Sequence, residues 1–152
     1  MQSRLTPAPN ELDVRIPSDV QYIEAIVQQV VARCAAQHFS RRHLALNVPV
    51  ALTEALSNAI LRGNREDASK SVRVRAAFDR ERMVVEVRDE GTGFDLDACT
   101  GDPTTDENLL REDGRGLFIM RRLMDEVERF SDGGNVVRLV LRRASASGAT
   151  AQ

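Results

Sequence analysis

Two pairs of segments with alternating side chains constrain the fold of this chain more than any other feature. Apolar residues alternate with arginines over residues 72–78, a charged turn follows, and the alternation resumes over residues 83–87. A second pair, residues 127–130 and 137–141, flanks the turn Asp132-Gly133-Gly134-Asn135. A period of two is typical of half-buried strands, and turn residues between two such runs favour a hairpin. We therefore expect two β-hairpins.

A strand and a helix are expected ahead of the first hairpin. Apolar and charged residues alternate from Glu11 to Ile16, and Pro17 ends this strand. Ser18 is the expected N-cap of the helix that follows. The apolar residues of this helix recur at three- and four-residue steps: Val20, Ile23, Val27, Val30, Val31 and Cys34.

A second helix is expected from about Pro49 to Arg62, with Gly63 as its left-handed C-terminal stop. Its buried side would be formed by Leu52, Ala55, Leu56, Ala59 and Ile60. A third helix is indicated between the hairpins by Leu117, Ile119, Met120, Leu123 and Met124.

The order strand, two helices, hairpin, loop, helix, hairpin predicts an α+β fold. Its economical form is a two-layer α/β sandwich with helices on one face of a mixed, largely antiparallel sheet. A chain of 152 residues fits one domain, which we place at residues 10–143. Residues 1–9 and 144–152 lack periodicity and are expected to be disordered tails.

Composition excludes several classes of protein. Apolar residues make up 42% and charged residues 29%, which is typical of a globular domain. The net charge of −2 argues against a nucleic-acid binder, since such proteins carry a basic excess. No signal peptide or run of about 20 apolar residues stands out, so we expect a cytoplasmic protein without a membrane segment.

The cysteines and histidines do not indicate a metal site. Cys34 and Cys99 lie far apart with no ligand-spaced neighbours, and we interpret both as free thiols. His38 and His43 have no acidic or cysteine partner at ligand spacing, and we interpret them as surface residues.

Glu54 and Asn58 stand four residues apart on the second predicted helix and therefore project from the same face, away from its apolar side. Asparagine is a poor choice inside a helix because its amide competes for backbone hydrogen bonds. The pair predicts either a carboxylate and an amide that line one cavity or an ordinary solvated helix face.

Two glycine motifs follow within residues 89–116, a polar stretch longer than a simple connection. Asp89-Glu90-Gly91-Thr92-Gly93-Phe94 comes directly after a strand, where glycines let backbone approach a ligand closely. Gly114-Arg115-Gly116-Leu117 opens the third helix, whose free N–H groups suit a phosphate chain. Taken singly, the first is equally compatible with a tight turn and the second with a loop-to-helix junction.

Together the three motifs resemble a known superfamily. Residues 51–64 are similar to the N box of GHKL (Bergerat-fold) ATPases, residues 89–94 to the first glycine box, and residues 114–117 to the second. Within that superfamily, residues 114–127 resemble the anti-sigma-factor serine/threonine kinases. The resemblance covers roughly residues 11–142.

The resemblance implies a role for each motif. Asn58 would offer its amide oxygen to Mg²⁺, which bridges the phosphates of ATP. Asp89 would accept a hydrogen bond from the exocyclic amine of adenine, with Gly91 and Gly93 giving the base and ribose room. Residues 95–113 would form the ATP lid. The backbone of the second glycine box would hold phosphates: Gly114, Arg115, Gly116 and Leu117.

The resemblance also implies an activity and partners. Glu54 would be the general base for transfer of the γ-phosphoryl group to a serine of an anti-anti-sigma protein of STAS fold. The protein would also sequester a sigma factor and form a homodimer.

Three other functions are compatible with parts of this pattern. In the first, the chain is a non-catalytic module, and bound ATP only sets the affinity of the chain for a protein partner. A sensor histidine kinase needs a phosphoacceptor-histidine hairpin upstream, where only one helix is expected. Topoisomerase and chaperone ATPases need further domains that this length does not hold.

The sequence departs from the family pattern at two places. Arg62 stands where the family often has histidine, and Glu112-Asp113 stands where a positive side chain is common. Arg111 or Arg115 is the candidate for the missing charge. Arg115 is either a γ-phosphate contact or a solvated lid arginine.

Overall fold

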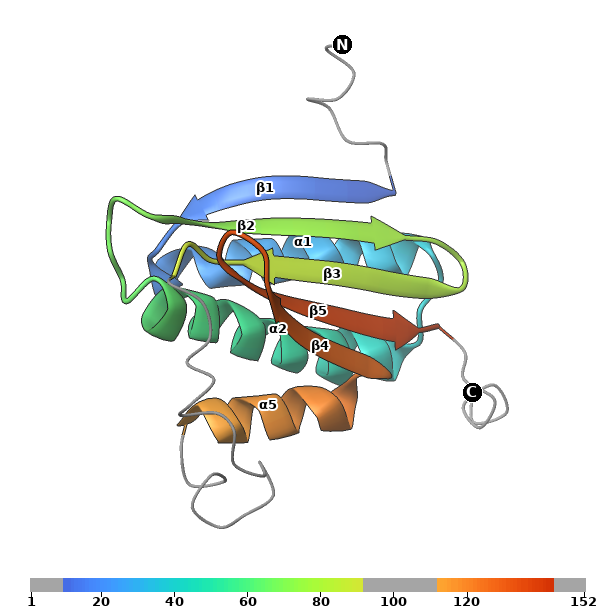
Figure 1. Cartoon of the computed structure of the whole chain (residues 1–152). Coiled ribbons are helices and arrows are strands. Elements are labelled where there is room, and N and C mark those ends of the chain that lie inside the picture. The colour runs from blue at the N-terminus through green and yellow to red at the C-terminus, as the bar shows by residue number, and fades with distance from the viewer. Residues whose placement is uncertain (1–9, 92–111, 144–152) are drawn as a thin grey trace.

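The computed structural model describes residues 10–91 and 112–143. Its five strands form one sheet in the order β1-β2-β3-β5-β4, and all four pairings are antiparallel. The helices lie together on one face of this sheet, with α5 beside α2 (Figure 1). The elements are β1 (Glu11–Pro17), α1 (Ile23–Ala36), α2 (Val48–Asn58), β2 (Ser71–Phe78), β3 (Arg82–Arg88), α5 (Glu112–Leu123), β4 (Glu126–Ser131) and β5 (Asn135–Arg142).

The predicted α+β sandwich and both hairpins are therefore confirmed. The expected mixed character of the sheet is not found among the described strands, which pair in antiparallel fashion throughout. The second hairpin turns at Gly133 and Gly134, whose positive φ angles of 69° and 148° suit glycine. The expected tails, Cys99, Gly93 and residues 95–111 of the expected lid lie outside the described residues.

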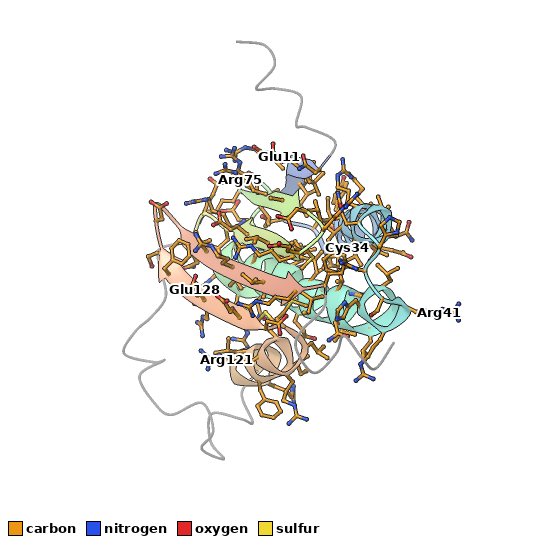
Figure 2. The ribbon with its side chains drawn as sticks, turned by 90° about the vertical axis from the view of Figure 1, so that its right-hand side faces the viewer. Glu11, Cys34, Arg41, Arg75, Arg121 and Glu128 are labelled. Carbon is orange, nitrogen blue, oxygen red and sulfur yellow. The ribbon has the colours of Figure 1, made fainter. Side chains whose placement is uncertain are left out.

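Alternation places the core between the sheet and the helices. Val85 of β3 lies opposite Ala76 of β2 and Leu139 of β5, and all three side chains are buried. The opposite side of the sheet is charged. Arg138 forms ion pairs with Glu86 and Glu128 on its two neighbouring strands. Figure 2 shows Glu128 and Arg75 on this outer side.

The first helix begins differently from the prediction. Ser18 is not its N-cap, because the Ser18 hydroxyl donates to the Lys70 carbonyl. Asp19 caps a short 3-10 turn, Val20–Tyr22, by accepting from the Gln21 N–H, and α1 follows. Val20 consequently lies on the surface, whereas the rest of the predicted stripe is buried or packed against the core.

The second helix is longer than predicted. Segments of π-helix, His43–Asn47 and Ala59–Gly63, extend α2 at its two ends. Gly63 is not a left-handed stop, since the described glycines with positive φ are Gly133 and Gly134. Arg65 and Glu66 adopt the left-handed conformation instead, with φ of 53° and 56°.

The run His43–Gly63 has 21 residues and is long and apolar enough, by those two measures, to cross a membrane. Core helices pass the same test, and Leu52, Leu56 and Ile60 of this run are among the fully buried side chains of the domain core. We therefore interpret it as the central core helix.

The interpretation of His43 as a surface residue is wrong. Its ring packs against Phe39, and its Nδ1 atom is buried without a hydrogen-bond partner among the described residues. Desolvation lowers the pKa of His43 below its ordinary value. His38 is exposed, as predicted. Cys34 is a free thiol, as predicted, and burial raises its pKa to about 12.

Candidate nucleotide-binding site

Helices α2 and α5 bring three of the predicted site residues together. A Cβ atom on Gly116 of α5 would lie 2.9 Å from Glu54 Oε1 and 3.1 Å from Asn58 Nδ2, both on α2. At the other end of the contact, Asn47 Nδ2 donates to the Leu123 carbonyl at 2.8 Å. Glu54 and Asn58 are half-buried. They therefore face a neighbouring helix at a distance that only glycine permits, and they do not form a fully solvated face.

Asp89 follows the end of β3 and is only 5% exposed. Burial raises the pKa of its carboxyl group, and hydrogen bonds from Gly91 and Asn135 act in the opposite direction. Those bonds all reach Oδ1: from Gly91 N at 2.8 Å, Asn135 N at 3.2 Å and Asn135 Nδ2 at 3.0 Å. None of the described hydrogen bonds reaches Oδ2, so one oxygen is saturated while the other keeps accepting capacity.

Glycines surround the Asp89 carboxylate. A Cβ on Gly63 would overlap Asp89 Oδ2, and a Cβ on Gly91 would lie 2.6 Å from the Gly63 carbonyl oxygen and 3.0 Å from Asp89 Oδ1. Glycine is therefore needed at position 63 because Asp89 packs directly against its backbone, and not because of a positive φ angle. Gly63 ends the same helical run that carries Glu54 and Asn58. That run therefore contacts both the predicted phosphate-binding region at α5 and the predicted adenine-binding region at Asp89.

Asn64 is a site-supporting residue that the sequence analysis did not identify. It is 1% exposed, and its Oδ1 accepts from the Glu90 N–H at 2.7 Å. Its Nδ2 donates to Ser18 Oγ and to the Ser71 carbonyl, both at 2.9 Å. The side chain thus joins the end of the helical run to the segment that carries Asp89. The position of Asn64 directly after the predicted helix-ending Gly63 was the one sequence feature that could have indicated this role.

Asn135 was also missed, because it was interpreted only as a turn residue. It is 7% exposed, and both its backbone and its side chain donate to Asp89. Its backbone carbonyl in turn accepts from the Asp89 N–H at 2.9 Å. Asparagine is common in turns, so no signal in the sequence indicated this role.

The second glycine box lies inside α5 and does not open it, because the helix begins at Glu112. Gly114 and Arg115 belong to its first turn, where the first four N–H groups lack partners within a helix. Arg115 is exposed, and Leu117 is buried in the core, so Leu117 is open to a ligand at most through its backbone.

The chain is similar to proteins of one family along most of its length. The family model described as a histidine kinase-like ATPase domain matches residues 16–141. The serine-protein kinase RsbW of Bacillus subtilis is 28% identical over 133 residues, covering 84% of this chain and 82% of that protein. The RsbW of Staphylococcus aureus (strain Newman) is 25% identical over 138 residues, covering 84% of each chain.

One solved structure has a similar fold. The crystal structure of the RsbU and RsbW domains of a Mycobacterium tuberculosis protein superposes with a TM-score of 0.62 at 18% identity. The match covers 90% of this chain and 32% of that longer chain.

Proposed function

The chain belongs to the histidine kinase-like ATPase domain family, and from this premise we propose that it is an ATP-dependent protein serine kinase and anti-sigma factor. The observation that carries the proposal is the meeting of Glu54, Asn58 and Gly116 on two facing helices, on the same helical run that reaches Asp89. The arrangement would bring a general base (Glu54), a metal ligand (Asn58) and a carboxylate for recognition of the nucleobase (Asp89) into one continuous site.

Asp89 would recognise the adenine base. Asp89 is a buried residue, and its Oδ2 atom accepts none of the described hydrogen bonds. It is suited to accept the exocyclic amine N–H, and a charge-assisted bond of this kind contributes about 1.5–3 kcal/mol. Gly63 and Gly91 let the backbone pack closely against this carboxylate.

The donor set fits Mg²⁺ bound together with phosphates. Asn58 offers a neutral amide oxygen, which is a ligand type that hard cations accept, and the neighbouring Gly116 places no side chain against this amide. A bound Mg²⁺ would neutralise charge on the ATP phosphates. The N–H groups at the start of α5 would hold the same phosphates.

Glu54 would take the proton of the attacking serine hydroxyl. The serine oxygen forms a bond to the γ-phosphorus, the bond to the ADP oxygen breaks, and the proton passes to the Glu54 carboxylate. Glu54 lies one helical turn from Asn58, so the base and the phosphates would be adjacent.

The relatives named serine-protein kinase RsbW support serine as the acceptor. We further propose that the serine lies on a STAS-type anti-anti-sigma protein, that the chain also binds a sigma factor, and that it acts as a cytoplasmic homodimer. These partners follow from the resemblance of residues 114–127 to anti-sigma-factor kinases.

A phosphotransfer assay tests the proposal. The purified protein is incubated with γ-labelled ATP, Mg²⁺ and candidate STAS proteins, beside Glu54→Gln and the matched surface variant Glu24→Gln on α1. We expect label on a partner serine with wild type and Glu24→Gln, and a loss of at least about 100-fold with Glu54→Gln. Binding of ATP without any transfer would favour a non-catalytic, ATP-responsive module.

A further inference from the structure

Asn135 contains a buried polar atom that the described structure does not satisfy. Its side-chain nitrogen donates to Asp89 Oδ1 at 3.0 Å, but its side-chain oxygen is buried without a hydrogen-bond partner. The orientation of the amide follows from its neighbour, because a carboxylate accepts hydrogen bonds and therefore takes the nitrogen end. The free atom is thus an acceptor.

A buried acceptor without a partner costs free energy, and native proteins rarely leave one unpaired. Asn135 is 93% buried, so bulk water does not solvate its side chain freely. The unpaired oxygen therefore calls for a donor that the described residues do not supply, such as a ligand N–H or a trapped water.

The Asn135 side chain lies at the proposed base pocket, beside Asp89. The Asn135 amide contacts Asp89, and a Cβ on Gly91 would lie 3.0 Å from its nitrogen. The pocket therefore has two acceptors without partners among the described residues, Asp89 Oδ2 and Asn135 Oδ1. The exocyclic amine of a 6-aminopurine has two N–H donors.

We propose that Asn135 is a specificity-determining residue whose side-chain oxygen accepts the second N–H of the 6-amino group. The inference rests on the proposed function, because it requires the base to bind beside Asp89. A 6-oxopurine such as guanine would bring its own acceptor against the two acceptors of the pocket and would be rejected. Asn135 thus selects an adenine nucleotide together with Asp89.

The test compares ATP with N6-methyl-ATP by calorimetric titration. The methylated nucleotide retains one N–H, which Asp89 can take, and loses the second. The variant Asn135→Ser keeps a hydroxyl that can donate to Asp89 but lacks the amide oxygen. Asn135→Ala removes both the donor to Asp89 and the amide oxygen. Asn10→Ser, at an exposed position, is the matched control. Thermal unfolding of each variant checks that it is folded.

We expect methylation to weaken binding about tenfold in wild type and in Asn10→Ser, which corresponds to one hydrogen bond. In Asn135→Ser we expect ATP itself to bind about tenfold more weakly and the methylation penalty to fall below about twofold. GTP should gain relative to ATP in the same variant.

An unchanged methylation penalty in a folded Asn135→Ser would overturn the inference and show that Asn135 only holds Asp89 or a water. If Asn135→Ser does not fold, the penalty in Asn135→Ala decides in the same way. A wild-type protein that binds neither nucleotide would instead overturn the proposed function, so the two failures are distinguishable.

Discussion

At the scale of single residues, contact distances explain the glycines of the site. Gly63, Gly91 and Gly116 each lie where a Cβ would come within 3.0 Å of an atom of another segment. Real Cβ atoms essentially never come so close. These glycines therefore let two helices and one loop approach each other around polar side chains.

Gly116→Ala tests this requirement. The added methyl would lie 2.9 Å from Glu54 Oε1 and would occupy the space in front of Asn58. Because alanine is a better helix former than glycine by about 1 kcal/mol, we expect the fold to persist while affinity for Mg·ATP falls at least about tenfold.

Calorimetric titration measures this loss of affinity, with the exposed Arg121→Ala on the same helix as the control. Wild-type affinity in a folded Gly116→Ala protein would contradict the placement of phosphates between α2 and α5.

At the scale of elements, the end of the central helical run shows how a side chain can terminate a helix. Asn64 follows the π-helical segment Ala59–Gly63 and is tied to β2 and to Glu90 by its amide. The two residues after it are left-handed, a conformation that costs non-glycine residues about 1–2 kcal/mol each. Hydrogen bonds of the buried amide help to offset that cost.

Asn64→Ala should therefore reduce both stability and nucleotide binding. Truncation removes three hydrogen bonds of the side chain and leaves buried groups unpaired. We expect a loss of about 2–4 kcal/mol in the free energy of unfolding, measured in urea, and weaker ATP binding because Glu90 and Asp89 lose their support.

The exposed Asn10→Ala is the control for this variant and should change the free energy of unfolding by less than about 0.5 kcal/mol. A change of similar size in both variants would contradict the role of Asn64.

At the scale of the whole molecule, the two sides of the sheet contribute differently. The inner side packs apolar side chains against the helices and supplies most of the stabilisation by burial. The outer side carries partly exposed ion pairs such as Arg73 with Asp13, which contribute about 0–1 kcal/mol each. Substitutions on the outer side should therefore cost the fold little.

Ligand binding should stabilise the whole domain. A ligand at 100 times its Kd adds about 2.7 kcal/mol to the free energy of unfolding, which raises Tm by roughly 5–10 °C for a domain of this size. We expect this shift with Mg·ATP in a thermal melt and a much smaller one when EDTA replaces Mg²⁺. Asn58→Ala should show little shift under either condition, and a full shift in that variant would remove Asn58 from the site.

The sequence by itself determined most of the elements and the choice of candidate site residues. Periodicity and turn residues are short-range signals, so both hairpins, the three helices and the Glu54/Asn58 face could be predicted locally. The sequence did not reveal Asn64 and Asn135, whose partners Glu90 and Asp89 lie 26 and 46 residues away.

Only the tertiary structure decided which groups are buried together. The Ser18 hydroxyl donates to the Lys70 carbonyl and does not cap the first helix. Gly63 packs against Asp89, and the His43 ring packs against Phe39. Each of these outcomes depends on packing between elements, and the energy of burying a polar group is set by neighbours that the local sequence does not specify.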